Sequence, residues 1–523
     1  MRGDANLAEW ALWCGLAALL LWGCGLAALA AELPMRLLVT LIPDDSFYFL
    51  TIARNLAAGR GPTFDGFAPT SGFQPLWLWL LALLAWAVPA SSEQMPRAML
   101  ILQIGLAGGT ALLLTRCARR AYGPLAALAA LMLFGALVFG QSVNGMETAL
   151  AALALSIVVA ALLRTELLAR PKAAAGLGCG ALLGLTLLAR LDLVFLVLPL
   201  AAALAWRGGP GLRAALGLAG GVALLLGPYL LLNLLTTGDL MPISGTLKSS
   251  FPRPVFGAGI VQDSVAGPLV LAELAAMSVY LCWLGWGARR GAARSEIEIV
   301  VGCLAVGFVL HASHSWLFMQ RAVFAWHFVP YGMGVALIGA VAVGRAGRSW
   351  SAAWRGVAAM LVLAAMLVLG WRGVAQHAPV AAGDSWHARA YDAALWVRWA
   401  TPPDAALAMA DAGIFGYFSE RRVVNLDGLV NDRAYQRELA AGRLSAYLRG
   451  RGVVYLAKHA FWNNVPVSSG QYTIYDITFR SWLYDLPSDP IALRRDAEVY
   501  RSEPYMNGGW RTAFVIWRIA AGG

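Results

Sequence analysis

The chain is dominated by apolar runs that are long enough to cross a lipid bilayer. They lie near residues 8–31, 97–115, 121–141, 147–163, 174–190, 192–206, 213–234, 266–287, 297–313, 323–343 and 353–372. A hydrocarbon core about 30 Å thick needs about 20 apolar residues in a helix, with some shortfall tolerated. Hydrophobic residues make up 59% of the sequence and charged residues only 13%. We therefore predict a polytopic α-helical membrane protein.

Basic residues set the predicted orientation of these spans. One further apolar run, 73–89, is ambiguous. If this run is re-entrant or interfacial, the cytoplasmic loops hold roughly twice as many Arg and Lys as the outer loops, in agreement with the positive-inside tendency. If this run is a full span, most of these Arg and Lys residues fall in the outer loops, against the positive-inside tendency. We therefore predict about eleven crossings plus one re-entrant or interfacial helix, in the cytoplasmic (inner) membrane, with the N-terminus in the cytoplasm.

Hydropathy falls after Trp371, and this fall divides the chain. Residues 1–372 are predicted to form the transmembrane domain, with a first outer loop over 32–72. Residues 373–523 are predicted to form an extracytoplasmic (periplasmic or extracellular) soluble domain. A helical pattern near 385–399 precedes the short strand "ALAMA", the turn-helix "DAGIFGYFS" and the strands "RRVVNLD", "GVVYLAK", "YTIYDI" and "TAFVIWRI". Strands alternating with helices predict a C-terminal α/β domain.

Charge and cysteine usage narrow the possible functions. The net charge is +11, but the basic residues sit in small groups between apolar runs and form no patch interleaved with aromatic residues. No nucleic-acid partner is predicted. The six cysteines lie in or beside apolar runs, without a Cys-x-x-Cys pair or a histidine at ligand spacing. Neither a disulfide framework nor a zinc site follows.

Two adjacent carboxylates, Asp44 and Asp45, begin the first outer segment, "IPDDSFYFLTIARNLAAGRG", at 42–61. A charged carboxylate near the hydrocarbon is costly unless it is paired, hydrated or coordinating, so such acids are functional candidates. Successive helical residues point about 100° apart, so both cannot face one point of a regular helix. The alternative is structural: Pro43 fits a helix start, where acids interact favourably with the helix dipole.

Other charged residues fall on the same predicted side of the membrane. They are Glu147 in "NGMETAL", Arg190 and Asp192 in "LLARLD", and Lys248 and Arg253 in "LMPISGTLKSSFPRP". A carboxylate base beside such cations suits displacement of a phosphate leaving group, because the base deprotonates a hydroxyl while Arg or Lys stabilises the departing phosphate. The structural alternatives are a helix cap for Glu147, a mutual pair for Arg190 and Asp192, and solvated loop charges for the other two.

These stretches resemble the GT-C superfamily of membrane glycosyltransferases. "DSFYFLTIARNLAAGRG", with Asp45 ahead of an aromatic-rich helix, is similar to the first outer loop of that superfamily. The resemblance continues in order through "TSGFQPLW", "NGMETAL", "LLARLD", "PISGTLKSSF", "WHFVPYG" and "DAGIFGYFSERRVVNLDGL". It implies inverting transfer of a sugar from a polyprenyl-phosphate-linked donor, in contact with membrane lipids, to a hydroxyl of a lipid, polysaccharide (glycan) or protein acceptor at the outer face.

The resemblance also implies roles for particular residues. Asp45 corresponds to the catalytic base and Asp44 to a helper or metal contact, Glu147 to a site that orients substrate or binds a cation, and Arg190 to a position that faces the lipid phosphate. The remaining substrate-binding candidates are Lys248, Arg253, Gln74 and His327. The cofactor prediction stays open between none and a divalent cation held by Asp44, Asp45 and Glu147.

One departure from the family pattern bears on that cation. Gln74 stands before a proline where many relatives carry His or another charged residue. A neutral amide carries no titratable proton and is a poor ligand for a transition metal. In the outer domain, Asn425 and Asp427 of "NLDGL" are either acceptor contacts or an Asx-turn.

Two other function classes remain open. A secondary transporter predicts repeated halves and polar residues near the bilayer midplane. The sequence shows no repeat, and its charges gather at the ends of the apolar runs. A non-catalytic envelope-assembly protein would leave the paired aspartates without a purpose.

Overall fold

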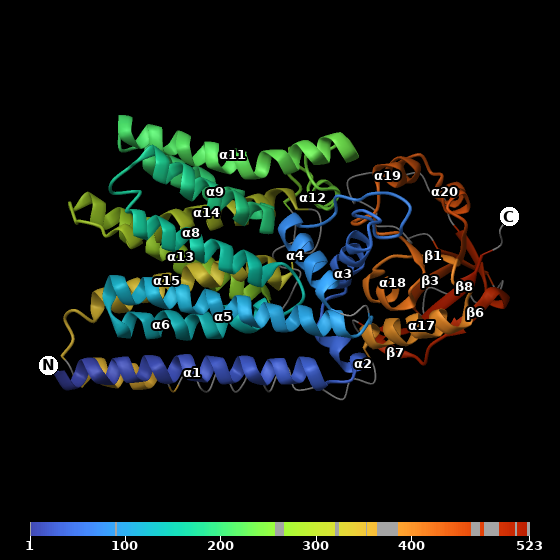
Figure 1. Cartoon of the computed structure of the whole chain (residues 1–523), viewed down its shortest axis with the longest axis horizontal. Coiled ribbons are helices and arrows are strands. Elements are labelled where there is room, and N and C mark those ends of the chain that lie inside the picture. Colours follow the sequence, from blue (N-terminus) through green and yellow to red (C-terminus); the bar gives the residue numbers. More distant parts are fainter. Residues whose placement is uncertain are drawn as a thin grey trace. The chain divides into compact units, whose positions relative to one another are not determined.

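The computed structural model shows a helical membrane part and a small mixed sheet (Figure 1). It describes residues 2–88, 91–256, 266–319, 324–351, 353–362, 364, 385–461, 471–474, 491–507 and 510–519. The chain divides into two compact units, each described here by itself. Unit 1 comprises Met1–Ala31, Leu100–Tyr229 and Phe251–Ala378, and unit 2 comprises Glu32–Met99, Leu230–Ser250 and Pro379–Gly523.

Unit 1 is a bundle of apolar helices that pack side by side (Figure 1). α6 packs against α15, α8 against α9, and α13 against both α14 and α15. Close approach requires small residues: a Cβ on Gly180 of α9 would lie 2.1 Å from the Leu218 carbonyl oxygen of α11. The helices are α1 (Arg2–Glu32), α5 (Gln94–Tyr122), α6 (Pro124–Phe134), the π-helical turn η2 (Gly135–Phe139), α7 (Gly140–Ser142), α8 (Thr148–Thr165), α9 (Ala173–Ala189), η3 (Leu191–Leu196), α10 (Val197–Ala205), α11 (Gly209–Thr237), α13 (Ala266–Arg289), α14 (Glu296–Phe318), η5 (Ala325–Phe328) and α15 (Val329–Ala346).

Eight helical stretches of the described chain are long and apolar enough to cross a membrane, so this is a multi-pass membrane protein. Four shorter apolar helices cover Pro75–Ala87, Ala173–Ala189, Leu191–Ala205 and Ala353–Val362. The predicted eleven crossings count the last three as spans, and that number stays a prediction. α4 (Pro75–Ala87) has 13 residues. It rises only about 20 Å, which is short of a bilayer core and agrees with the non-spanning role predicted for 73–89.

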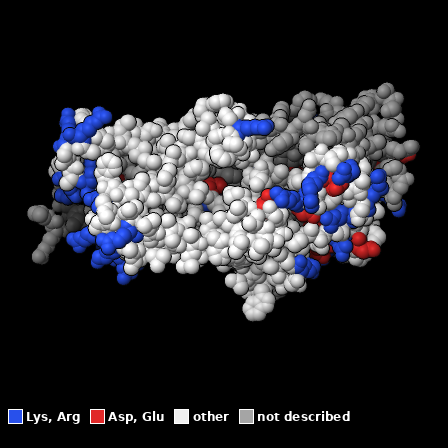
Figure 2. All heavy atoms as spheres, turned by 90° about the horizontal axis from the view of Figure 1, so that it is seen from above, with Lys and Arg blue, Asp and Glu red and all other residues white. Residues whose placement is uncertain are grey.

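The charges of unit 1 are unevenly distributed. Figure 2 shows Lys and Arg side chains gathered at one end of its helices and, beyond them, a broad surface with few charged side chains. Such a surface is what a helix bundle presents to lipid tails. The basic end is the one expected to face the cytoplasm, and the orientation itself remains a prediction.

Unit 2 contains a mixed sheet with the strand order β2-β1-β3-β8-β6, and β7 also pairs with β8. β1 is parallel to both β2 and β3, while β8 is antiparallel to β3, β6 and β7. The predicted C-terminal α/β domain is confirmed, and the end of the predicted strand "YTIYDI" lies outside the described residues. The strands are β1 (Ala406–Met409), β2 (Arg422–Asn425), β3 (Val453–Phe461), β6 (Glu498–Arg501), β7 (Tyr505–Asn507) and β8 (Trp510–Arg518), with β4 (Gln471–Ile474) and β5 (Ile491–Arg494) as a separate pair.

Residues 32–72, the predicted first outer loop, belong to the same compact unit as this sheet. α18 packs against both α17 and α3, and the ring of Phe47 lies 5.5 Å from that of Phe418. The sequence division at 372/373 follows hydropathy and stays a prediction. The helices of unit 2, besides α4, are α2 (Met35–Leu38), η1 (Val39–Leu41), α3 (Asp44–Ala57), α12 (Ile243–Lys248), α17 (Trp386–Ala400), α18 (Gly413–Ser419), α19 (Arg433–Ala440), α20 (Leu444–Gly450) and η7 (Arg495–Ala497).

Candidate active site

Asp44, the first residue of α3, binds the beginning of another helix. It is buried, with 6% of its surface exposed. Its Oδ2 accepts a hydrogen bond from the Gly413 N–H at 2.7 Å, and its Oδ1 accepts one from the Ile414 N–H at 2.8 Å. A Cβ on Gly413 would lie 2.0 Å from the Asp44 carbonyl oxygen, so only glycine fits. Asp44 therefore caps α18 and holds it against α3, whereas the sequence had suggested a cap on its own helix.

The surroundings of Asp44 disfavour its charged form. Burial raises the pKa of this carboxyl well above its usual range, the N–H donors of Ile414 and Gly413 lower it by less, and the charge of Asp411 raises it further. Both oxygens of Asp44 are already occupied by backbone donors. The side chain is thus built into the packing of unit 2.

Asp45 follows directly and points about 100° further around α3. It is half-buried, and its carboxylate makes no hydrogen bond or ion pair with any residue that the structure describes. Burial raises the pKa of Asp45, the ammonium of Lys248 lowers it in part, and the charge of Asp427 raises it. A half-buried carboxylate with a raised pKa and no partner among the described residues has the properties of a general base.

Tyr48, one turn further along α3, ties the helix to the strands. Its hydroxyl donates to Oδ2 of Asp427 at 2.5 Å and accepts a hydrogen bond from Nδ2 of Asn425 at 3.1 Å. Oδ1 of Asp427 accepts from the Leu429 N–H at 2.8 Å, which closes an Asx-turn. Asn425 and Asp427 are 1% and 3% exposed. Of the two alternatives for "NLDGL", the structure shows the turn.

Lys248 and Gln74 also lie in unit 2. Lys248 is the last residue of α12 and is half-buried, and it is the cation whose charge acts on Asp45. Gln74 precedes Pro75 at the start of α4. Its Oε1 is buried and makes no hydrogen bond within the described part of the chain.

Unit 1 contains a second charged cluster, centred on Arg190. This arginine is 2% exposed, and it donates from Nη1 to Oε1 of Glu147 at 2.7 Å and from Nη2 to Oδ2 of Asp192 at 2.9 Å. Nε2 of His311 lies 3.9 Å from Oδ2 of Asp192. The hydroxyl of Tyr331 lies 2.9 Å from Nδ1 of His311. The structure thus brings together Glu147, Arg190 and Asp192, as the shared side of their sequence positions suggested.

The charge of this cluster limits what it can bind. Two carboxylates face one guanidinium, so Glu147, Arg190 and Asp192 together carry a net negative formal charge. The side chain of Asp192 is 32% exposed, against 4% for Glu147. Of the two carboxylates, Asp192 is therefore the one that an incoming anion can replace.

The other two candidates of unit 1 lie on its surface. Arg253 is exposed. His327 is half-buried in η5, with Nδ1 3.1 Å from the Phe324 carbonyl oxygen, and its ring stacks on that of Trp326 at 5.7 Å. Neither position assigns a role by itself.

The residues suggested for a divalent cation come from both units, Asp44 and Asp45 from unit 2 and Glu147 from unit 1, and the cation stays a prediction. Both oxygens of Asp44 accept backbone N–H groups, and Glu147 is ion-paired with Arg190. Within the described ranges no group of three or more His, Cys, Asp or Glu side chains is arranged to hold a metal ion.

Comparison with known sequences yields little. Residues 379–500 match a family model described as a domain of unknown function, DUF8728. No curated protein matches the sequence.

Comparison with solved structures is more informative. ArnT from Cupriavidus metallidurans bound to undecaprenyl phosphate aligns over 98% of this chain and 99% of its own, with a TM-score of 0.57 and 14% identity. Its apo form aligns over 90% and 93%, with a TM-score of 0.53 and 15% identity. The archaeal oligosaccharyltransferase AglB from Archaeoglobus fulgidus, in complex with an inhibitory peptide and a dolichol-phosphate, aligns over 85% and 69%, with a TM-score of 0.53 and 13% identity.

Both solved proteins are GT-C enzymes. The chain has a GT-C fold. The predicted fold class and the resemblance stated from the sequence are thereby confirmed, while identities of 13% to 15% support the fold alone. Substrates and residue roles do not follow from this likeness and are proposed separately.

Proposed function

We propose that the protein is an inverting glycosyltransferase that moves a sugar from a polyprenyl-phosphate-linked donor to an acceptor hydroxyl, with Asp45 as the catalytic base. The observation that carries the proposal is the contrast between the two aspartates. Both carboxylate oxygens of Asp44 accept hydrogen bonds from the first N–H groups of α18. The carboxylate of Asp45 is half-buried and has no partner among the described residues, and the charge of Lys248 lowers its pKa in part. The solved GT-C structures with undecaprenyl phosphate and with dolichol-phosphate support a lipid-linked donor.

The chemistry needs few groups from the protein. Asp45 accepts the proton of the acceptor hydroxyl as its oxygen attacks the anomeric carbon of the sugar. The bond between that carbon and the phosphate oxygen breaks, and its electron pair leaves with the polyprenyl phosphate. Lys248 stabilises this anion, so no general acid is required. A single displacement inverts the anomeric centre.

The Arg190 cluster is proposed to contribute to donor binding. Asp192 is the more exposed of its two carboxylates and is the group that a phosphate would replace on Nη2 of Arg190, while the buried pair with Glu147 keeps the guanidinium in position. An Arg190→Lys variant keeps the charge but loses the fork geometry that serves two partners at once. We expect it to raise the KM for the donor.

Asp45→Asn tests the base. Purified protein is incubated with a panel of polyprenyl-phosphate sugars, and donor consumption and product anomeric configuration are measured. Loss of a positioned base costs about 10²- to 10⁴-fold in rate. The matched control is Asp404→Asn, which removes the same charge from an exposed aspartate of unit 2. Transfer by Asp45→Asn at the wild-type rate would refute the assignment, as would a product with retained configuration.

The rival classes give distinct results in the same preparation. Uptake of a solute into sealed vesicles without donor consumption would identify a transporter. Absence of both would indicate a non-catalytic assembly protein. A proposed inner-membrane location with a cytoplasmic N-terminus and an outer C-terminal domain is tested by protease access from each side of oriented vesicles.

A further inference from the structure

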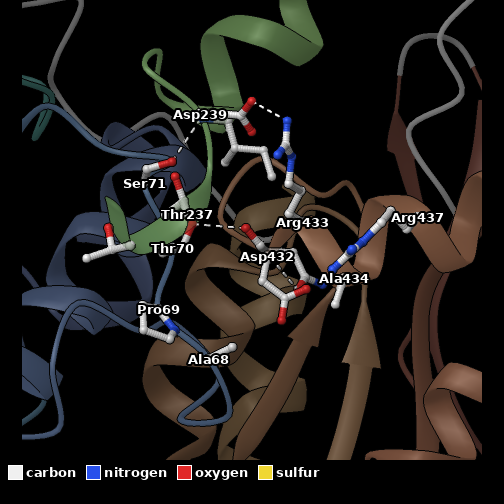
Figure 3. A pocket seen from close by; sticks show the side chains of 13 residues that line it. Ala68, Pro69, Thr70, Ser71, Thr237, Asp239, Asp432, Arg433, Ala434 and Arg437 are labelled. Atoms are coloured by element: carbon white, nitrogen blue, oxygen red, sulfur yellow. Dashed lines mark hydrogen bonds and ion pairs between the residues drawn. The ribbon is translucent and has the colours of Figure 1, made fainter. Parts of the chain in front are cut away.

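A polar cavity of about 320 Å³ lies in unit 2, between the end of α11, the loop before α4 and the start of α19 (Figure 3). The hydroxyl-bearing residues Thr70, Ser71 and Thr237 line it, together with Asp239 and Arg437. Its volume is at the lower end of the range of about 300–1,000 Å³ in which proteins bind small molecules. It would hold roughly ten water molecules at about 30 Å³ each.

The lining offers donors and acceptors close together. Oδ1 of Asp239 pairs with Nη2 of Arg433 at 2.5 Å. Oδ2 of Asp239 and the guanidinium of Arg437 make no hydrogen bond or ion pair within the described part of the chain, and both residues line the cavity. Ser71 Oγ accepts from the Ile243 N–H at 3.2 Å, which leaves its hydroxyl hydrogen available to donate. A ligand with several hydroxyls, each both donor and acceptor, matches this mixture.

The charge balance argues against an anion. Two aspartates and two arginines line the cavity, so their formal charges cancel. Arg433 is already paired with Asp239, and Asp432 is paired with Arg451 at 3.0 Å. A phosphate at Arg433 would meet the charge of Asp239, whereas a neutral polyol meets no repulsion. Ala68, Pro69 and Ile243 add an apolar side that suits the C–H groups of a sugar ring.

The cavity is connected to the candidate base through one short helix. Ile243, which lines the cavity, begins α12, and Lys248, which acts on Asp45, ends it. Five helical steps correspond to about 7–8 Å. The distance along α12 from the cavity to Lys248 is thus within the length of a short oligosaccharide.

We propose that this cavity binds a neutral sugar unit of the acceptor, so that the acceptor is a glycan. Calling this sugar an acceptor rests on the proposed glycosyltransferase function. Sugar binding by the cavity does not depend on that function. Asp239 accepts hydrogen bonds from two sugar hydroxyls, or Asp239 and Ser71 bind the same sugar hydroxyl. Arg437 donates hydrogen bonds to the ring oxygen or to hydroxyl oxygens of the sugar. Specificity for the acceptor would then depend on the residues that line this cavity, and these residues do not contact the reacting atoms.

The test measures binding without turnover. Saturation-transfer NMR is recorded on the full-length wild type and on Asp45→Asn, without donor, against a panel of neutral mono- and disaccharides, inorganic phosphate and short peptides. We expect at least one saccharide to bind. Arg437→Ala and Asp239→Asn should each weaken it about tenfold or more, because each removes a charge-assisted hydrogen bond. Both should also raise the acceptor KM more than they lower kcat.

Arg443→Ala is the matched control. It removes the same charge from an exposed arginine just after α19, whose partner Glu438 is also at the surface. Its saccharide affinity should equal that of the wild type. A wild type that binds no saccharide of the panel, or a site occupied by phosphate or peptide in competition with the saccharide, overturns the proposal. Equal weakening by the control overturns it too.

The two proposals fail in different ways. If saccharide binding depends on Arg437 and Asp239 but the protein consumes no donor, the cavity is a sugar-binding site and the transferase proposal is refuted. Donor consumption without saccharide binding supports the transferase and refutes the cavity's role. The two measurements are therefore made on the same preparations.

Discussion

Replacing Asp44 by alanine should loosen α18 from α3 without directly changing the groups proposed for chemistry. The change removes the acceptor of two N–H groups, those of Gly413 and Ile414, at 2.7 Å and 2.8 Å. Neither can find another acceptor in its own helix, because the first N–H groups of a helix have no intrahelical partner. Each buried, unsatisfied donor costs about 1–3 kcal/mol.

The net effect is smaller than the sum of those two costs. Burial raises the pKa of the Asp44 carboxyl, so its charged form is itself unfavourable and its removal returns some free energy. We expect about 2–4 kcal/mol of local destabilisation, which corresponds to about 30- to 700-fold faster hydrogen exchange at Gly413 and Ile414. Asp44→Asn keeps one acceptor oxygen and should lose about half as much. Asp404→Ala, at an exposed aspartate, is the control.

The pH dependence gives a second check on the same residue. A carboxyl whose pKa is raised by folding binds its proton more tightly in the folded state, so its contribution to stability is complete below about pH 3.9 and is lost as the pH rises through the folded pKa. The stability difference between wild type and Asp44→Ala should therefore shrink as the pH rises from about 4. Unchanged exchange at Gly413 and Ile414 in the variant, or a difference that grows with pH, would refute this account.

Further predictions concern α3, α12 and α18. Since burial raises the pKa of Asp45, kcat/KM should fall on acidification with an apparent pKa above about 3.9, and a profile flat to pH 4 would contradict the role of base. Lys248→Met should shift that apparent pKa upward and lower kcat about tenfold or more, whereas Lys248→Arg should retain most activity. Gly413→Ala should lower the thermal unfolding temperature because its Cβ would lie 2.0 Å from a backbone oxygen, while Gly245→Ala, with no atom within 4 Å, should not. Tyr48→Phe should cost about 1–3 kcal/mol in stability, measured by thermal unfolding, because it takes a donor from buried Asp427.

Much of the fold follows from local sequence. The long apolar runs define the helices of unit 1, since a helix satisfies its own backbone hydrogen bonds wherever it is placed in lipid. The C-terminal strands "ALAMA" and "TAFVIWRI" were likewise predicted, and they form β1 and β8. β6 and β7 were not predicted, because "EVYR" and "YMN" are too short for a period to emerge.

The candidate site was predicted only in part. Asp45, Glu147 and Arg190 were named from residue type and position, and the Glu147–Arg190 ion pair shows that distant segments of unit 1 converge as expected. The sequence could not show that both oxygens of Asp44 are hydrogen-bonded to Gly413 and Ile414, because those partners lie 369 and 370 residues away in the chain. The cavity beside Asp239 was missed for the same reason.

The sequence by itself determined that the chain crosses a membrane many times and carries two adjacent acids, Asp44 and Asp45, after its first apolar run. Composition and periodicity are local properties of the sequence, and they determine which segments are transferred from water into the membrane. The tertiary structure alone decided which acid is hydrogen-bonded to the rest of the described chain, because the difference between Asp44 and Asp45 depends on what packs against each side of one helix.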